Sequence, residues 1–148
     1  MEKNIFKLKK FFDKVIIIDA SVLIKVFLEE KESDYANELI GLHIDRRLTL
    51  LSTHLLTFEL LNILIRHLQS ESNVNKAYQE FKLLQIGLIP LESPVIKKAI
   101  YLANKDKKIS FYDAAYHALA KHMEATFLTA DRKYYELMKK EGNIELFT

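Results

Sequence analysis

Several residue types are absent or scarce in this chain of 148 residues. It contains no cysteine, which excludes disulfides, zinc–thiolate sites and thiol nucleophiles and is consistent with a reducing compartment. Only three glycines and two prolines occur, which argues against a turn-rich all-β sandwich and favours a helix-rich fold. The formal net charge of +2 is too small to indicate a nucleic-acid-binding protein by itself.

The remaining composition is typical of a folded domain. Hydrophobic residues make up 49% of the chain and charged residues 28%, and the length allows one domain with a proper core. No apolar run approaches the ~20 residues of a membrane span, and no small-residue cleavage site follows the basic start. We therefore expect a cytoplasmic protein with no membrane contact.

The sequence divides into a basic N-terminal arm, residues 1–13, and one domain, residues 14–148. The arm interleaves four lysines with apolar residues. This pattern fits either an amphipathic arm that binds a membrane or a partner, or a short helix packed on the domain. We assign it no function.

Apolar runs alternate with helical spacings along the domain. The runs predict strands at 15–18, 48–51, 88–91, 126–130 and 144–147, and the spacings predict helices at 20–29, 33–43, 53–68, 77–84, 94–104, 110–123 and 132–140. The polar stretch 69–75 is interpreted as a loop. We expect Ser33 to cap the helix at 33–43, and Ser52 or Thr53 to cap the helix at 53–68. Strands and helices that alternate with short links predict an α/β fold of three layers, α/β/α, with a central parallel sheet of four to five strands.

Acidic residues follow two of the predicted strands. Asp19 comes directly after the run Val15-Ile16-Ile17-Ile18, and Asp131 comes after residues 126–130. A parallel sheet brings the carboxyl ends of its strands to one edge, so we expect the two acids to lie close together. The alternative for Asp19 is a capping role at the start of the following helix.

Two further acids lie on predicted helices. Asp113 stands three residues after Ser110, where it would complete a capping box, and the alternative is that it only caps that helix. Glu59 shares one helix face with Asn62 and Arg66, and the alternative is an exposed Glu59–Arg66 pair. The helices that carry Glu59 and Asp113 are able to flank the edge at which Asp19 and Asp131 meet.

Crowded carboxylates repel each other unless a cation neutralises them. Three or four carboxylates, without cysteine and without paired histidines at metal spacing, favour Mg²⁺ or Mn²⁺. Such a site is able to activate water and stabilise a phosphoryl transition state, as in many nucleases and phosphatases.

Four short motifs occur in the order typical of PIN-domain proteins. They are Val-Ile-Ile-Ile-Asp19-Ala-Ser21, Phe-Glu59-Leu-Leu-Asn62, Ser110-Phe-Tyr-Asp113-Ala-Ala-Tyr-His-Ala-Leu-Ala120 and Leu-Thr129-Ala-Asp131. Over residues 14–148 the chain resembles the small VapC-type toxins of toxin–antitoxin pairs. The basic arm is longer than a minimal member of that family needs.

The resemblance implies a PIN-like fold and an endoribonuclease that depends on Mg²⁺ or Mn²⁺ and hydrolyses the phosphodiester bonds of RNA. The catalytic and metal-binding acids would be Asp19, Glu59, Asp113 and Asp131, and the supporting polar residues would be Ser21, Asn62 and Thr129. The resemblance also implies a homodimer and a cognate antitoxin protein that blocks the cleft.

Two other functions remain open from the sequence. One is a non-catalytic PIN-like module that binds RNA or protein. The other is a phosphate-ester hydrolase for small molecules, which is disfavoured because Ala20 and Ser21 follow Asp19 where an Asp-x-Asp pair would stand. We expect the five histidines to be surface or half-buried residues. Basic residues would line an RNA path toward the acids, namely Arg46, Arg47, Arg66, Lys107, Lys108, Arg132 and Lys133.

Overall fold

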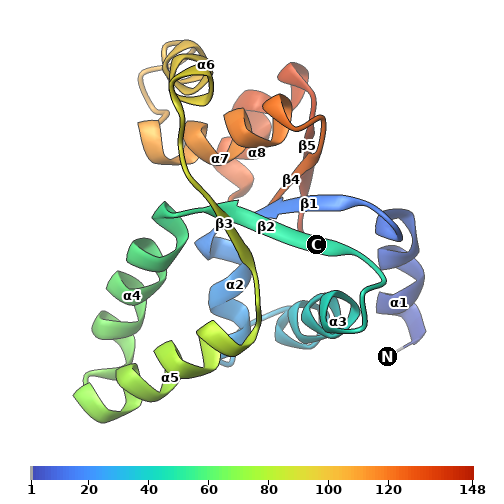
Figure 1. The fold of residues 1–148 in the computed structure, drawn as a ribbon, viewed down its shortest axis with the longest axis vertical. Coiled ribbons are helices and arrows are strands. Elements are labelled where there is room, and N and C mark those ends of the chain that lie inside the picture. Colours follow the sequence, from blue (N-terminus) through green and yellow to red (C-terminus); the bar gives the residue numbers. More distant parts are fainter. Residues whose placement is uncertain (1) are drawn as a thin grey trace.

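Five parallel strands form the centre of the molecule (Figure 1). The computed structural model describes residues 2–148. The strands are β1 (Val15–Ile18), β2 (Thr49–Thr53), β3 (Gly87–Ile89), β4 (Thr126–Thr129) and β5 (Ile144–Leu146). Their order is β3-β2-β1-β4-β5, and each neighbouring pair is parallel. The central strand β1 therefore lies beside β4, with Ile18 opposite Leu128.

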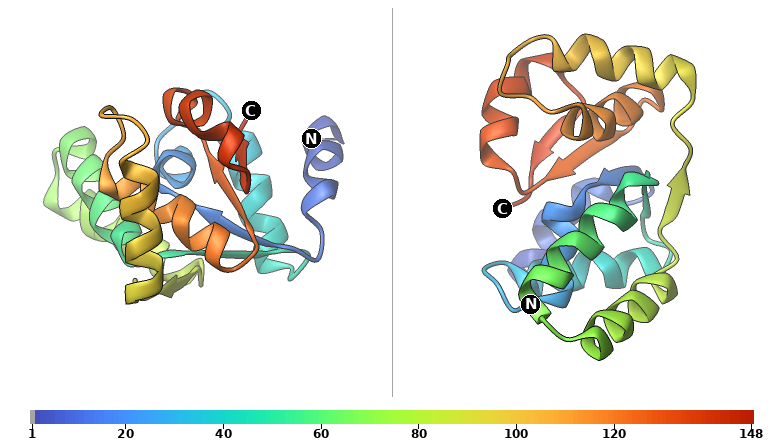
Figure 2. Two further views of the ribbon diagram at one scale, coloured as in Figure 1. Left: turned by 90° about the horizontal axis from the view of Figure 1, so that it is seen from above. Right: turned by 90° about the vertical axis from the view of Figure 1, so that its left-hand side faces the viewer.

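Helices cover both faces of this sheet. They are α1 (Glu2–Leu8), α2 (Ala20–Phe27), α3 (Ser33–Ile44), α4 (Leu55–Leu68), α5 (Glu71–Leu83), α6 (Ser93–Ala103), α7 (Phe111–His122) and α8 (Arg132–Met138). Figures 1 and 2 show α6, α7 and α8 on one side of the sheet and α2, α3, α4 and α5 on the other. The predicted three-layer fold with a parallel sheet is confirmed. Within residues 2–148, no helix is both long and apolar enough to cross a membrane.

The central strand shows why this layering forms. Ile16, Ile17 and Ile18 are completely buried, because helices pack on both faces of β1. An uninterrupted β-branched run is what such a doubly covered parallel strand requires. The same logic applies to β4, where Phe127 and Leu128 are buried.

The basic arm packs on the domain. Its helix α1 continues into a 3₁₀ turn (Lys9–Phe11), and Leu8 and Phe11 are buried in the main core. Lys10 forms an ion pair with Glu145 of β5, and α1 contacts α3. The arm thus joins the first residues of the chain to the edge strand β5.

Three local predictions are wrong. Only Gln69 and Ser70 lie between helices, because residues 71–75 belong to α5, and Ser70 caps that helix by accepting a hydrogen bond from the Asn73 amide at 3.3 Å. Ser52 and Thr53 end β2, and the N-cap residue of α4 is His54. The Ser52 hydroxyl donates to the Ile18 carbonyl at 2.6 Å, and the Thr53 hydroxyl accepts from the Leu55 amide at 3.1 Å. Helix α3 has Glu32 as its N-cap residue rather than Ser33.

Candidate active site

Asp19 lies at the carboxyl end of β1 and is only 4% exposed. Its Oδ1 accepts hydrogen bonds from the Val22 amide at 3.3 Å and from the Ser21 hydroxyl, and its Oδ2 accepts from the Thr129 hydroxyl at 2.6 Å. Asp19 is therefore the N-cap of α2, as the alternative interpretation held. It is also a buried carboxylate whose two oxygens are both held in place.

A network of hydroxyl groups connects Asp19 to the end of the neighbouring strand. The Ser21 hydroxyl accepts from the Ala130 amide at 2.9 Å, and the Thr129 hydroxyl accepts from the Asp131 amide at 3.1 Å. Because β1 and β4 are adjacent, these bonds fix the segment that carries Asp131 against the start of α2. Ser21 and Thr129 thus position the backbone of the site as well as Asp19.

Asp131 and Asp113 stand at the amino ends of two further helices. Asp131 caps α8, since its Oδ1 accepts from the Tyr134 amide at 3.0 Å. Ser110 caps α7 by accepting from the Asp113 amide at 3.1 Å, and its hydroxyl donates to Asp113 Oδ2 at 3.1 Å. The predicted helix start at Ser110 is confirmed. Helix α7 runs back toward the start of β4, so its amino end lies at the carboxyl edge of the sheet.

Glu59 reaches the same edge from α4 and is half-buried. The Tyr116 hydroxyl, one helical turn beyond Asp113 on α7, donates to Glu59 Oε2 at 3.1 Å. Arg66 is exposed, and among residues 2–148 no ion pair involves Glu59. The alternative of a Glu59–Arg66 pair is therefore wrong.

The four acids interact electrostatically. Burial raises the pKa of Asp19 to about 6, the hydrogen bonds from Ser21 and Thr129 oppose that rise, and the charge of Asp113 adds to it. Burial likewise raises the pKa of Glu59 to about 7; the bond from Tyr116 opposes this, and the charges of Asp19 and Asp113 add to it.

Asp113 completes this group. Burial raises its pKa, the hydrogen bond from Ser110 lowers it, and the charge of Asp131 raises it. These effects link Asp19 with Glu59 and Asp113, and Asp113 with Asp131. We call these four residues the acidic cluster.

The donor set of the acidic cluster suits a hard divalent cation. It offers carboxylate oxygens without sulfur or imidazole, and none of its four acids takes part in an ion pair within residues 2–148. A cation would offset the repulsion that adds to the pKa rise caused by burial. In the described part of the chain, however, no group of three or more histidine, aspartate or glutamate side chains is arranged to hold a metal ion. The carboxylates are thus neighbours that do not converge on one point.

Asn62 lies apart from the hydroxyl network. It is exposed on α4 and lines a hollow together with Leu55, Phe58, Glu59 and Tyr112. The hollow opens beside the acidic cluster, because Glu59 belongs to both. Of the supporting residues, Ser21 and Thr129 contact Asp19, whereas Asn62 faces this hollow.

Two side chains of α7 have roles that sequence reasoning missed. Tyr116 is a fully buried core residue whose hydroxyl also donates to Glu59, and its place one turn after Asp113 was a usable signal. His117 is completely buried, which corrects the expectation that all histidines are at or near the surface. Its Nε2 donates to the Gly142 carbonyl at 2.7 Å, so Nδ1 accepts from the Tyr134 hydroxyl at 2.8 Å.

Some of the basic residues that were expected to line an RNA path lie far from the acidic cluster. Arg46 and Arg47 precede β2, so they lie at the amino edge of the parallel sheet, opposite the acidic cluster. Arg47 instead stacks over the ring of Phe12, with 4.4 Å from its guanidinium carbon to the ring centroid. Arg132 and Lys133, which directly follow Asp131, are exposed beside the acidic cluster.

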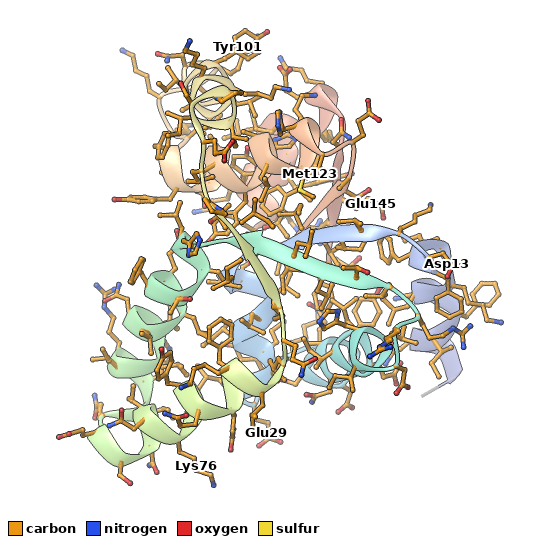
Figure 3. All side chains as sticks on the ribbon, viewed as in Figure 1. Asp13, Glu29, Lys76, Tyr101, Met123 and Glu145 are labelled. Carbon is orange, nitrogen blue, oxygen red and sulfur yellow. The ribbon has the colours of Figure 1, made fainter. Side chains whose placement is uncertain are left out.

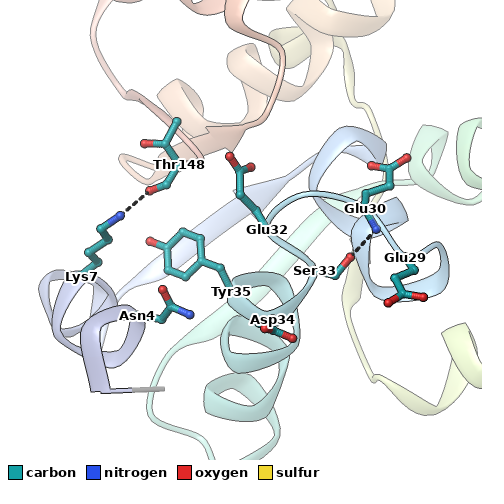
Figure 4. A pocket seen from close by; sticks show the side chains of 9 residues that line it. All are labelled: Asn4, Lys7, Glu29, Glu30, Glu32, Ser33, Asp34, Tyr35 and Thr148. Atoms are coloured by element: carbon teal, nitrogen blue, oxygen red, sulfur yellow. Dashed lines mark hydrogen bonds between the residues drawn. The ribbon is translucent and has the colours of Figure 1, made fainter.

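A second hollow lies between α1, the start of α3 and Thr148 (Figure 4). It has several acidic residues, but Lys25 lies 3.6 Å from Glu30 and 3.7 Å from Glu32 and offsets their charge. The side chains in Figure 4 point in different directions rather than toward a common centre. None of the four acids of the acidic cluster lines this hollow.

Comparison with known proteins identifies a family model and a set of similar folds. The model of the PIN domain matches residues 16–140. The structure of VapBC2 from Rickettsia felis bound to a DNA fragment from its promoter has a TM-score of 0.67 and 16% identity, covering 90% of this chain and 99% of that chain. No curated protein sequence matches significantly.

Two further solved structures have the same fold. VapC20 of Mycobacterium tuberculosis, described as a toxin that cleaves the sarcin–ricin loop, has a TM-score of 0.63 and 14% identity, covering 82% of this chain and 93% of that chain. A toxin–antitoxin complex from Klebsiella pneumoniae has a TM-score of 0.61 and 14% identity, covering 88% and 95%. At these identities the similarity establishes the fold.

Proposed function

The chain belongs to the PIN-domain family, and from this premise we propose that it is a metal-dependent endoribonuclease, the toxin of a type II toxin–antitoxin pair. The observation that carries the proposal is the acidic cluster at the carboxyl edge of the sheet. Asp19 and Glu59 have raised pKa values there, and no cationic side chain pairs with either within residues 2–148. A purely structural set of acids would be expected to have neutralising partners.

The proposed cofactor is Mg²⁺ or Mn²⁺, held by carboxylates from Asp19, Glu59, Asp113 and Asp131. Such an ion supplies Lewis-acid stabilisation of the negative charge that develops at a phosphodiester. Because carboxylates must be ionised to bind a metal, binding would displace the protons that Asp19 and Glu59 hold near neutral pH. Metal affinity would therefore rise with pH between about 5 and 8.

The chain's own residues prepare this site. Ser21 and Thr129 hold both oxygens of Asp19 and favour its ionised form. Tyr116 orients Glu59 and opposes the rise in its pKa. A pKa of about 7 allows Glu59 to hold or release a proton at neutral pH, which suits a group beside a hydrolytic reaction. Arg132 and Lys133 are placed to attract phosphate.

The proposed partners are an RNA substrate, a cognate antitoxin and a second copy of the chain. The VapBC2 and Klebsiella structures with the same fold contain toxin–antitoxin complexes, and the VapC20 structure is described as that of a toxin that cleaves the sarcin–ricin loop. Carried over to this chain, these descriptions support an antitoxin partner and an RNA substrate. A cytoplasmic location is part of the proposal and rests on the family resemblance. Homodimerisation rests on the family resemblance.

The test is cleavage of a labelled RNA pool by the purified chain with Mn²⁺, with EDTA, and with Asp19→Asn. Asp45→Asn is the matched control, because Asp45 is exposed at the end of α3, before β2 and thus near the amino edge of the sheet. We expect cleavage by the wild type and Asp45→Asn with Mn²⁺, and none with EDTA or with Asp19→Asn. Equal cleavage by wild type and Asp19→Asn would refute the assignment.

A non-catalytic RNA- or protein-binding module is the second candidate. The observation that favours it is the lack of a convergent metal-binding group within residues 2–148. It predicts no heat of Mn²⁺ binding in calorimetry and RNA or partner binding that Asp19→Asn leaves unchanged. Saturable Mn²⁺ binding that is lost in Asp113→Asn would exclude it.

A further inference from the structure

The hollow beside the acidic cluster contains two large aromatic side chains exposed to solvent. Phe58 on α4 is 69% exposed and Tyr112 on α7 is 56% exposed. With Leu55, Glu59 and Asn62 they line one hollow, which we call the aromatic hollow, with a cavity volume of about 490 Å³. This volume falls within the ~300–1,000 Å³ typical of ligand sites.

The aromatic hollow connects two elements of the acidic cluster. Phe58 immediately precedes Glu59, and Tyr112 immediately precedes Asp113. Tyr112 also packs edge-to-face against Phe111, with ring centroids 6.3 Å apart and planes at 73°. Exposed aromatic rings that flank the proposed reaction centre are placed to contact whatever is attached to the scissile phosphate.

The chemistry of the aromatic hollow selects a neutral planar group. No lysine or arginine lines it within the described residues, and Glu59 would repel a phosphate. A nucleobase is neutral, and stacking on an aromatic ring is tolerant of its identity. The Asn62 amide offers both a donor and an acceptor to a base edge, and Glu59 offers an acceptor to a base amino group.

We propose that the aromatic hollow holds an unpaired nucleobase of the RNA, stacked on Phe58 and Tyr112 with its edge toward Asn62. The proposal rests on the proposed ribonuclease function, and it assigns to this surface of α4 and α7 the base that lies next to the cleaved bond. A base inside a duplex is already stacked on both sides and paired at its edge, so it cannot enter. Phe58 and Tyr112 are then positioning and specificity-determining residues.

The direct test is a short unstructured RNA that carries 2-aminopurine, whose fluorescence is quenched when it stacks on an aromatic ring. It is titrated into the Asp19→Asn protein, which keeps the RNA intact, and into the same protein with Phe58→Ala or Tyr112→Ala. We expect quenching by the parent, and about 5- to 150-fold weaker binding with less quenching for each alanine variant. Tyr112→Phe retains the ring and is expected to bind like the parent.

Tyr101→Ala is the matched control. Tyr101 is 58% exposed on α6, does not line the aromatic hollow, and points away from the sheet at the top of Figure 3. Its removal is expected to leave RNA affinity and quenching unchanged. The same RNA annealed to its complement is expected to bind the parent more weakly, with no quenching that depends on Phe58 or Tyr112.

The outcomes separate the two proposals. If the wild type cleaves RNA with Mn²⁺ but Phe58→Ala and Tyr112→Ala behave like Tyr101→Ala, the base-stacking proposal fails and the nuclease stands. If quenching depends on the two rings but the wild type cleaves no RNA, the nuclease fails and the base site stands. If the alanine variants instead lower the mass of a dimer in sedimentation at unchanged RNA affinity, the hollow is a protein interface and the proposal is overturned.

Discussion

Replacing Asp19 by asparagine is expected to stabilise the metal-free protein at neutral pH. Asp19 is buried, and its pKa rises from 3.8 to about 6 in the folded chain. Between these two values the folded state binds a proton more readily than the unfolded state, so stability decreases as pH rises through this range. Below about pH 4 the effect is absent, and above about pH 6 the full destabilisation remains.

The magnitude follows from the size of this pKa change. A rise from 3.8 to about 6 corresponds to a destabilisation of about 3 kcal/mol at pH 7. Asparagine has the same shape and no charge, and its amide faces hydroxyl oxygens of Ser21 and Thr129 that are able to accept hydrogen bonds. We therefore expect Asp19→Asn to be more stable by about 2–3 kcal/mol at pH 7, which for a chain of this size raises the Tm by about 5–10 °C.

The assay is thermal unfolding followed by circular dichroism from pH 4 to pH 8 in EDTA, with Asp45→Asn as control. The wild-type and Asp19→Asn curves should converge near pH 4 and separate as pH rises. Added Mn²⁺ should raise the Tm of the wild type and have little effect on Asp19→Asn. A lower Tm for Asp19→Asn than for wild type at pH 7 in EDTA would show that the carboxylate stabilises the fold, contrary to this reasoning.

Three further predictions test other contacts. Tyr116→Phe removes the donor to Glu59, so the acidic limb of the pH profile of kcat/KM should move upward by about one pH unit; an unmoved limb would contradict the role of this bond. His117→Leu leaves the Gly142 carbonyl and the Tyr134 hydroxyl unpaired and should destabilise by about 2–4 kcal/mol in urea unfolding, whereas His122→Leu on the exposed face of α7 should be near neutral. In Gly41→Ala, the new Cβ in α3 meets open space, so the substitution should stabilise the fold by up to about 1 kcal/mol. Gly87→Ala should not stabilise the fold, because its Cβ would lie 2.6 Å from Leu51 Cδ2. Equal changes in the free energy of unfolding for the two variants would refute this contrast.

Local pattern was sufficient to predict most of the fold. Strand β1 was located because a central parallel strand needs a continuous apolar run, and residues 15–18 are such a run. The start of α5 was missed because its polar residues face solvent and, within α5, only Val74, Ala77, Tyr78 and Phe81 pack against the core. A helix that buries only a narrow face has a weak hydrophobic periodicity in its sequence. Its cap residue Ser70 could not be distinguished from the other polar residues around it.

Only part of the candidate site could be predicted from the sequence. The placement of Asp19 and Asp131 at the same edge of the sheet follows from parallel topology, since both acids follow adjacent strands. The bond from Tyr116 to Glu59 joins residues 57 positions apart, and it depends on how α4 and α7 pack across the end of the sheet. The burial of His117 likewise depends on Tyr134 and Gly142, which are distant in sequence. Tertiary packing, rather than residue spacing, creates both contacts.

A capping role does not conflict with the proposed metal-binding role of the same acids. Asp19 caps α2, Asp131 caps α8 and Asp113 lies in the first turn of α7, so the amino ends of three helices lie at the carboxyl edge of the sheet. The partial positive charge of each helix end offsets part of the repulsion among the acids. Glu59 lies beyond the first turn of α4, and within residues 2–148 its one hydrogen-bond donor is the Tyr116 hydroxyl. Its pKa of about 7 exceeds the value of about 6 for the more deeply buried Asp19. Capping contacts thus hold the three aspartates in place, whereas Glu59 is the acid whose ionisation would depend most on the proposed cation.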